Sequence, residues 1–150
     1  RKRKKKRLEK QADPMASMYG TLRENVRGRL GAMGREVAFR KVPGPRLSDI
    51  ILGLAQPLLD LAKTEAAKKN AVAITIAAWN CALLPPGNRE RFLDDLDHRI
   101  PGISSPVLKD MVEEIAGRKA ELYPDIRRFV MDFVVTCNGD EVRLVVATTL

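Results

Sequence analysis

One stretch of the chain is apolar on every side. Ala71 to Leu84, AVAITIAAWNCALL, holds the sole Trp of the sequence and no charged residue. Large apolar side chains recur at the spacing of one helical face, and small apolar residues fill most of the other positions. Such a helix is stable only when protein surrounds it. The run is too short to span a bilayer and is interrupted by Asn80, so it predicts the central helix of a folded core and no membrane span.

Three amphipathic segments with the same 3.6-residue period accompany this helix. The first follows the Pro-Gly-Pro sequence at 43–45, which forbids a continuous helix, and Ser48 is placed to cap its start. The second follows Asn88, another candidate cap, and the third opens with Ser105 and a proline. We therefore expect helices over about 49–62, with a kink at Pro57, over 89–99 and over 105–122.

The period of the apolar positions changes to two near the C-terminus. Phe129 to Cys137 and Glu141 to Leu150 are rich in β-branched residues and flank Asn138-Gly139, a strong signal for a hairpin turn. With these two residues as the turn, one face of the hairpin is apolar almost throughout, and we expect it to pack on the 105–122 helix. The predicted pairs are Cys137 with Asp140, Val135 with Val142, Phe133 with Leu144, and Met131 with Val146.

The second face of this hairpin is unusually apolar for one turned to water, because it carries Val130, Val134, Val145 and Ala147 among its polar residues. Two interpretations follow. The hairpin, residues 129–150, makes a homodimer by pairing strand edges or stacking faces. Alternatively, the N-terminal segment of the same chain folds over this face.

Charge divides the chain at the Pro-Gly-Pro boundary. The net charge is +8 and the pI about 9.8, but residues 1–46 hold 15 Lys or Arg against four acidic residues, a net +11. Residues 47–150 hold 12 basic and 15 acidic residues, a net −3. Attraction to nucleic acid or to another anionic surface therefore belongs to the first third of the chain.

The basic third has two parts. Arg1 to Gln11 is a block of like charge that does not fold alone, and it suits a nucleic-acid arm, a membrane-surface patch, a nuclear address or a solvated tail. From Asp13 to Lys41 apolar residues recur at helical spacing, but several glycines weaken the helix. We expect either a basic amphipathic helix that orders on a partner or a loosely docked N-terminal helix.

No arrangement of residues in the sequence indicates a catalytic site, a metal site or a cofactor site. Asp94 and His98 share a helical side, but one carboxylate and one imidazole are too few for a metal site. Cys81 and Cys137 lie among apolar neighbours and are expected to be buried thiols, which together with the absence of a signal-like run predicts a cytoplasmic protein. The charges of the last predicted helix, at Lys109, Glu113, Glu114, Arg118 and Lys119, are expected to form ordinary surface ion pairs.

We thus predict an α+β domain over 47–150, with about four helices around the central helix 71–84 and a C-terminal antiparallel β-hairpin, preceded by a basic, partly disordered or weakly helical arm over 1–46. The favoured function is a non-catalytic accessory or interaction module. Its arm would contact nucleic acid or another polyanion through phosphates, without sequence readout. The alternatives are a protein-binding or dimerising regulatory module that uses the hairpin, with the basic segment only a tail, and an enzyme whose site no motif reveals. The expected polyanion-binding residues are Lys2, Arg3, Lys4, Lys5, Lys6, Arg7, Arg23, Arg27, Arg29 and Arg35.

Overall fold

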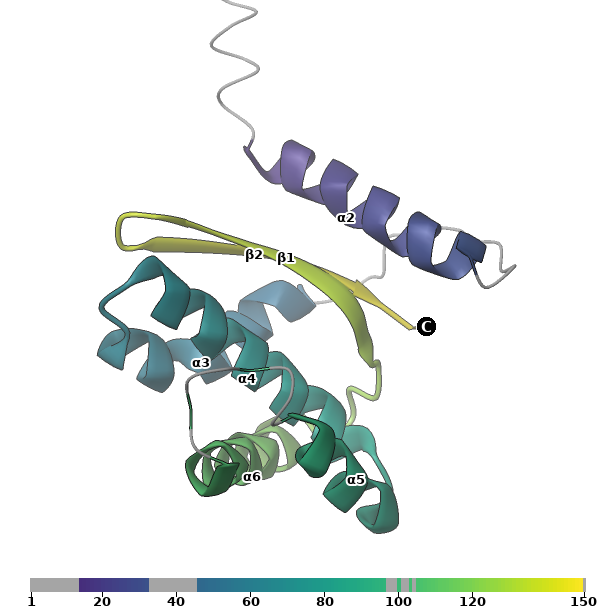
Figure 1. Cartoon of the computed structure of the whole chain (residues 1–150), viewed down its shortest axis with the longest axis vertical. Helices are drawn as coiled ribbons and strands as arrows, with labels where there is room; N and C mark the ends of the chain where they lie inside the picture. The colour runs from purple at the N-terminus through teal and green to yellow at the C-terminus, as the bar shows by residue number, and fades with distance from the viewer. Residues whose placement is uncertain (1–13, 33–45, 97–99, 101–102, 104, 150) are drawn as a thin grey trace, which may run out of the picture.

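The computed structural model describes residues 14–32, 46–96, 100, 103 and 105–149. Within these ranges the chain forms helices and one antiparallel hairpin stacked in layers, with helix α2 above the hairpin and the other helices below it (Figure 1). The predicted α+β class is confirmed. The elements are α2 (Pro14–Ala32), α3 (Leu47–Leu61), α4 (Glu65–Leu83), α5 (Pro86–Leu96), α6 (Ser105–Leu122), β1 (Val130–Asn138) and β2 (Glu141–Thr148).

Helix α4 is the centre of the main core, as its sequence predicts. Trp79 and Val72 have no solvent-exposed surface, and α3, α5, α6 and β1 all contact this helix. The helix begins six residues earlier than its apolar run, at Glu65, because the Thr64 hydroxyl accepts a 3.0 Å hydrogen bond from the Ala67 N–H. The polar residues before the apolar run therefore form the first turns of the same helix, supported by this N-cap.

Two other predicted helix starts are wrong. Ser48 lies inside α3 and is buried, and Arg46 precedes the helix without a side-chain cap. Asn88 lies inside α5, which begins at Pro86 because proline needs no hydrogen-bond partner in the first turn. Helix α3 continues through Pro57. Helix α6 ends at Leu122 as predicted, and Ser105, the expected cap, is its first residue.

The hairpin turn is shifted by one residue from the prediction. Asn138 pairs with Glu141, so Gly139 and Asp140 form the two-residue loop, and Val135 lies opposite Leu144 instead of Val142. Gly139 has a φ of 61°, and no non-glycine residue in the described part of the chain has a positive φ. Glycine at the first loop position is the pattern of a type II′ turn, which matches the twist of the strands. From Asp132 to Cys137 the partner of each residue moves by two positions, so these residues keep their predicted faces. At the start of β1 an irregularity in the pairing places Val130 in the main core, and not on the second face as predicted.

Each face of the hairpin packs on a different layer. One face, with Leu144 buried, packs mainly on α4 and α3, whereas the sequence suggested α6. The other face, with Val145 fully buried, contacts α2. Of the two interpretations of the second apolar face, the structure therefore has the one in which the N-terminal segment of the same chain covers it.

Candidate interaction surfaces around helix α2

Helix α2 docks on the hairpin through a narrow apolar stripe. Met18, Leu22 and Val26, one helical turn apart, are buried against Val145. The Thr136 hydroxyl adds a 3.4 Å contact to the Met18 sulfur. One buried side chain per turn is a small contact for a helix of 19 residues, so most of the surface of α2 stays available to solvent or to a partner.

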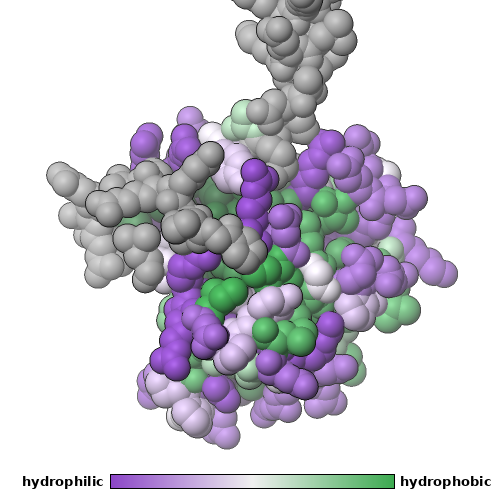
Figure 2. Space-filling model, turned by 180° about the vertical axis from the view of Figure 1, so that it is seen from behind, coloured by the Kyte–Doolittle hydropathy of each residue, from purple (hydrophilic) through white to green (hydrophobic). Residues whose placement is uncertain are grey.

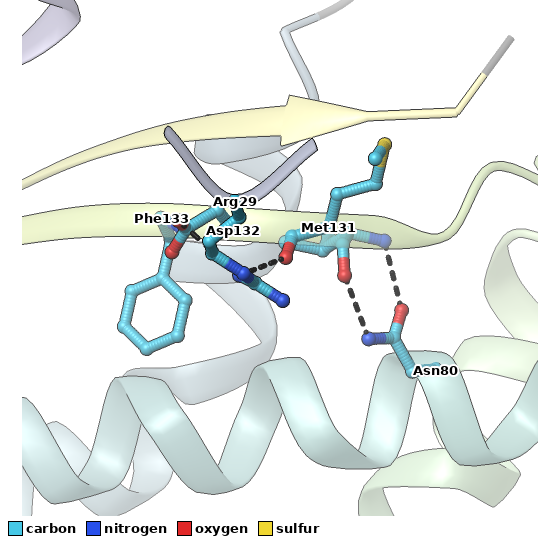
Figure 3. A network of polar contacts seen from close by, with 6 residues as sticks. Arg29, Asn80, Met131, Asp132 and Phe133 are labelled. Carbon is cyan, nitrogen blue, oxygen red and sulfur yellow. Dashed lines mark hydrogen bonds and ion pairs between the residues drawn. The ribbon is translucent and has the colours of Figure 1, made fainter. Parts of the chain in front are cut away.

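The C-terminal end of α2 is held by a polar contact at a β-bulge. Val130 pairs with Thr148 and Asp132 with Ala147, which leaves Met131 as the extra residue of β1. Its carbonyl accepts a 3.2 Å hydrogen bond from Nη1 of Arg29, and the same nitrogen lies 3.3 Å from Oδ2 of Asp132 (Figure 3).

Solvent limits the strength of this contact. The Arg29 side chain is 66% exposed and that of Asp132 is 20% exposed. An ion pair in this setting contributes about 0–1 kcal/mol. Arg29 therefore orients the end of α2 more than it stabilises the fold.

The predicted polyanion-binding residues fall into three groups. Arg23 and Arg27 are exposed on α2, each one residue after a buried position and so about 100° around the helix from the stripe. Arg29 is turned toward the hairpin and engaged there. The structure thus brings Arg23 and Arg27 to one side of the helix and separates Arg29 from them. Lys2, Arg3, Lys4, Lys5, Lys6, Arg7 and Arg35 lie outside the described residues.

A cleft of about 310 Å³ opens beside the bulge, between α4, α5 and β1. Arg29 lies at its rim and also lines a smaller pocket of about 190 Å³ under the end of α2. Asn80 also lines the cleft, and its amide donates to the Val130 carbonyl at 2.9 Å and accepts from the Val130 N–H at 2.8 Å (Figure 3). The sequence does not predict this cleft, and its one available signal is Asn80, an amide within an apolar helix.

A buried lysine lies on the far side of α4. Lys119 is only 3% exposed, and its ammonium donates to the carbonyls of Tyr123 and Ile126 at 2.9 and 2.7 Å. It also sits 4.8 Å from the centroid of the Trp79 ring, a cation–π distance. Burial, with a smaller effect from Arg127, lowers the pKa of Lys119.

The expectation that Lys119 belongs to a surface ion pair is wrong. Its contacts instead hold the segment after α6 against the core, together with a 2.9 Å hydrogen bond from the Trp79 indole to the Arg128 carbonyl. The sequence carried no sign of this role, because the acceptors are backbone carbonyls that any residue supplies.

Other chemistry is sparse in the described ranges. They contain no group of three or more His, Cys, Asp or Glu side chains placed to hold a metal ion, and His98 lies outside them. Both cysteines are free thiols, and burial raises the pKa of Cys81. Cys81 is buried as predicted, whereas Cys137 is half-buried.

A search of the described helices for one long and apolar enough to cross a membrane finds none. Comparisons of the chain with protein-family models, with curated proteins and with solved structures give no match.

Proposed function

We propose that this protein is a non-catalytic interaction module that contacts nucleic acid or a similar polyanion through its basic N-terminal third. One observation carries the proposal: α2 docks by its apolar stripe and leaves Arg23 and Arg27 exposed on another side. A docked helix fixes the backbone from which these side chains extend, so less backbone conformational entropy is lost when they bind phosphates. Lys2 to Arg7 precede this helix in the chain and supply further charge.

Charge and aromatic content favour contacts to the phosphate backbone. The net +11 of residues 1–46 stands against a net −3 for the remainder, so a polyanion is attracted to one part of the protein. Single-strand binding by base stacking needs exposed aromatic rings. In the described ranges every aromatic side chain is buried or half-buried, Trp79 completely. Binding through phosphates carries no sequence information, which supports recognition without sequence readout.

A protein partner is the second candidate. The rear face of the molecule carries an apolar area framed by hydrophilic side chains (Figure 2), and Leu61 at the end of α3 is largely exposed. A homodimer through residues 129–150 forms by pairing strand edges in this proposal, because α2 covers the hairpin face that would otherwise stack. A monomeric mass by light scattering at tens of micromolar protein would argue against that dimer.

The cytoplasmic location is also part of this proposal. It rests on the free thiols Cys81 and Cys137, which are typical of a reducing compartment.

The test is fluorescence anisotropy of a labelled DNA duplex and an RNA of equal length, titrated with the full chain at several salt concentrations. Each arginine–phosphate contact adds about 0.9 to the slope of log K against log salt for duplex DNA. Arg23→Gln with Arg27→Gln should therefore lower that slope by about 2 and weaken binding equally for unrelated sequences.

The control carries the same change of charge elsewhere. Lys63→Gln with Lys109→Gln removes two exposed positive charges from the loop before α4 and from α6, away from α2. This variant should bind like the wild type. Absence of binding at low salt, or equal losses in the two double variants, would refute the proposed surface.

A further inference from the structure

The cleft beside the β1 bulge combines an apolar lining with two charged residues, Arg29 and Asp132, that face each other. Helices α4 and α5 supply the apolar side, and the bulge supplies the opposite wall. Its volume of about 310 Å³ is at the lower end of the range for ligand pockets, about 300–1,000 Å³. A small molecule therefore suits the cleft better than a peptide or a cofactor. The apolar side consists of Ala73, Ile76, Ala77, Phe92 and Leu96.

Most polar groups at the rim are already paired. The Asn80 amide is satisfied in both directions by Val130. Asp132 accepts the Phe133 N–H at 2.8 Å with Oδ1 and faces Arg29 with Oδ2. These groups therefore offer little to a ligand, and among the described residues that line the cleft Arg29 is the one cationic donor.

Arg29 has hydrogen-bonding capacity that its contacts do not use. A guanidinium carries five N–H donors, and the contacts of Arg29 within the described residues all involve Nη1. Figure 3 shows the guanidinium turned into the space between β1 and α4. The remaining donors have the planar fork geometry that suits a bidentate carboxylate.

The charge of the ligand is limited by the neighbouring carboxylate. A phosphate monoester carries about −1.5 to −2 at neutral pH and would face Asp132 with one arginine to balance it. A carboxylate carries a single negative charge. The combination of one guanidinium, one adjacent carboxylate and an apolar lining thus favours a monoanion with an apolar body.

We propose that this cleft binds a small monocarboxylic acid, with its carboxylate on Arg29 and its apolar body against Ile76, Phe92 and Leu96. The site is separate from the polyanion surface, because Arg23 and Arg27 lie on another side of α2. Arg29 also holds the end of α2, so an occupied cleft places the ligand at the contact between α2 and the hairpin.

Octanoate is the probe, with octanol and octylammonium as matched compounds that lack the negative charge. Isoleucine methyl NMR of the full chain reports the site directly, because Ile76 and Ile100 line the cleft whereas Ile51 and Ile115 lie elsewhere in the core. Octanoate should shift the first two saturably and leave the other two unchanged. A charge-assisted contact is worth about tenfold or more in affinity, so octanol should bind at least that much more weakly.

Two variants separate the charge from the apolar lining. Arg29→Gln should reduce octanoate binding to the level of octanol, with Arg23→Gln as the control that binds like the wild type. Ala73→Leu fills the cleft from α4, leaves every residue of α2 unchanged and should weaken both compounds about tenfold or more. Octanoate that fails to shift Ile76 and Ile100, octanol or octylammonium that binds as tightly, or an Arg29→Gln variant that keeps full octanoate affinity would each overturn the proposal.

Discussion

Asn80 joins the central helix to the first strand, and its removal is the sharpest test of how the two layers are held together. Its side chain makes a reciprocal pair of hydrogen bonds with the Val130 backbone, at 2.8 and 2.9 Å. The amide thus takes the place of a neighbouring strand at this edge of β1. Asn80→Ala leaves a buried backbone N–H and C=O of Val130 without these partners.

The magnitude follows from these contacts. Two hydrogen bonds contribute about 1 kcal/mol each, and leaving the buried N–H and C=O of Val130 without partners costs at least about 1 kcal/mol more. Alanine has a higher helix propensity than asparagine, which raises the free energy of unfolding by roughly 0.5 kcal/mol. We therefore expect Asn80→Ala to lower the free energy of unfolding by about 2–3 kcal/mol.

Urea unfolding measures this change directly. Trp79 is the sole Trp of the chain and is fully buried, so its fluorescence follows unfolding of the core, and circular dichroism follows the helices. Asn25→Ala, at an exposed position of α2, is the matched control and should change the stability by less than about 0.5 kcal/mol. A loss below about 1 kcal/mol for Asn80→Ala, or equal effects of the two substitutions, would refute this account of the contact.

Three further predictions concern single residues. Burial lowers the pKa of Lys119 below the 10.5 of an exposed lysine. At a pH between the pKa of the folded state and 10.5 the unfolded chain binds more protons, so the free energy of unfolding should rise with pH in this window. Urea unfolding measures this rise, and Lys119→Met should flatten it. Burial raises the pKa of Cys81, so a thiol reagent at neutral pH should modify Cys81 much more slowly than Cys137 in the folded protein and at a similar rate in urea. An added Cβ at Gly28 meets no atom within 4 Å, so Gly28→Ala should stabilise α2 by roughly 0.5–1 kcal/mol, seen as slower amide hydrogen exchange in that helix alone.

The elements that the sequence predicts well are those whose signal is long and periodic. The apolar run that ends at Leu84 identifies the central helix, and the alternation on either side of Gly139 identifies the hairpin. The ends of the helices are predicted less accurately, because several residues near a helix start are suited to cap it. Thr64 and Ser48 both suit a helix start, and only the first is used. The turn was misplaced for a similar reason, since Asn-Gly and Gly-Asp both suit a two-residue loop.

The parts that the sequence does not predict depend on side chains that bind backbone carbonyls. Arg29 meets the carbonyl of Met131, 102 residues away, and Lys119 binds carbonyls four and seven residues further along the chain. Neither acceptor is a side chain, so no residue type marks the partner. The cleft depends on contacts between distant segments, because it forms where a bulge in β1 passes over two helices. Of the candidate polyanion residues, periodicity placed Arg23 and Arg27 off the apolar stripe. Arg29, three residues after Val26 and seven after Leu22, falls on the side of the stripe, but the sequence does not identify its partner in the hairpin.

The covering of the hairpin by α2 sets an order of events during synthesis. The surface on which Met18 docks comes from strands more than a hundred residues later in the chain, as its contact with Thr136 illustrates. Closing so long a loop is slow compared with local helix formation. While the ribosome makes the intervening helices, α2 has no docking surface, and its glycines give it little helical tendency of its own. Met18, Leu22 and Val26 therefore stay exposed on a newly made chain until both strands of the hairpin have been made.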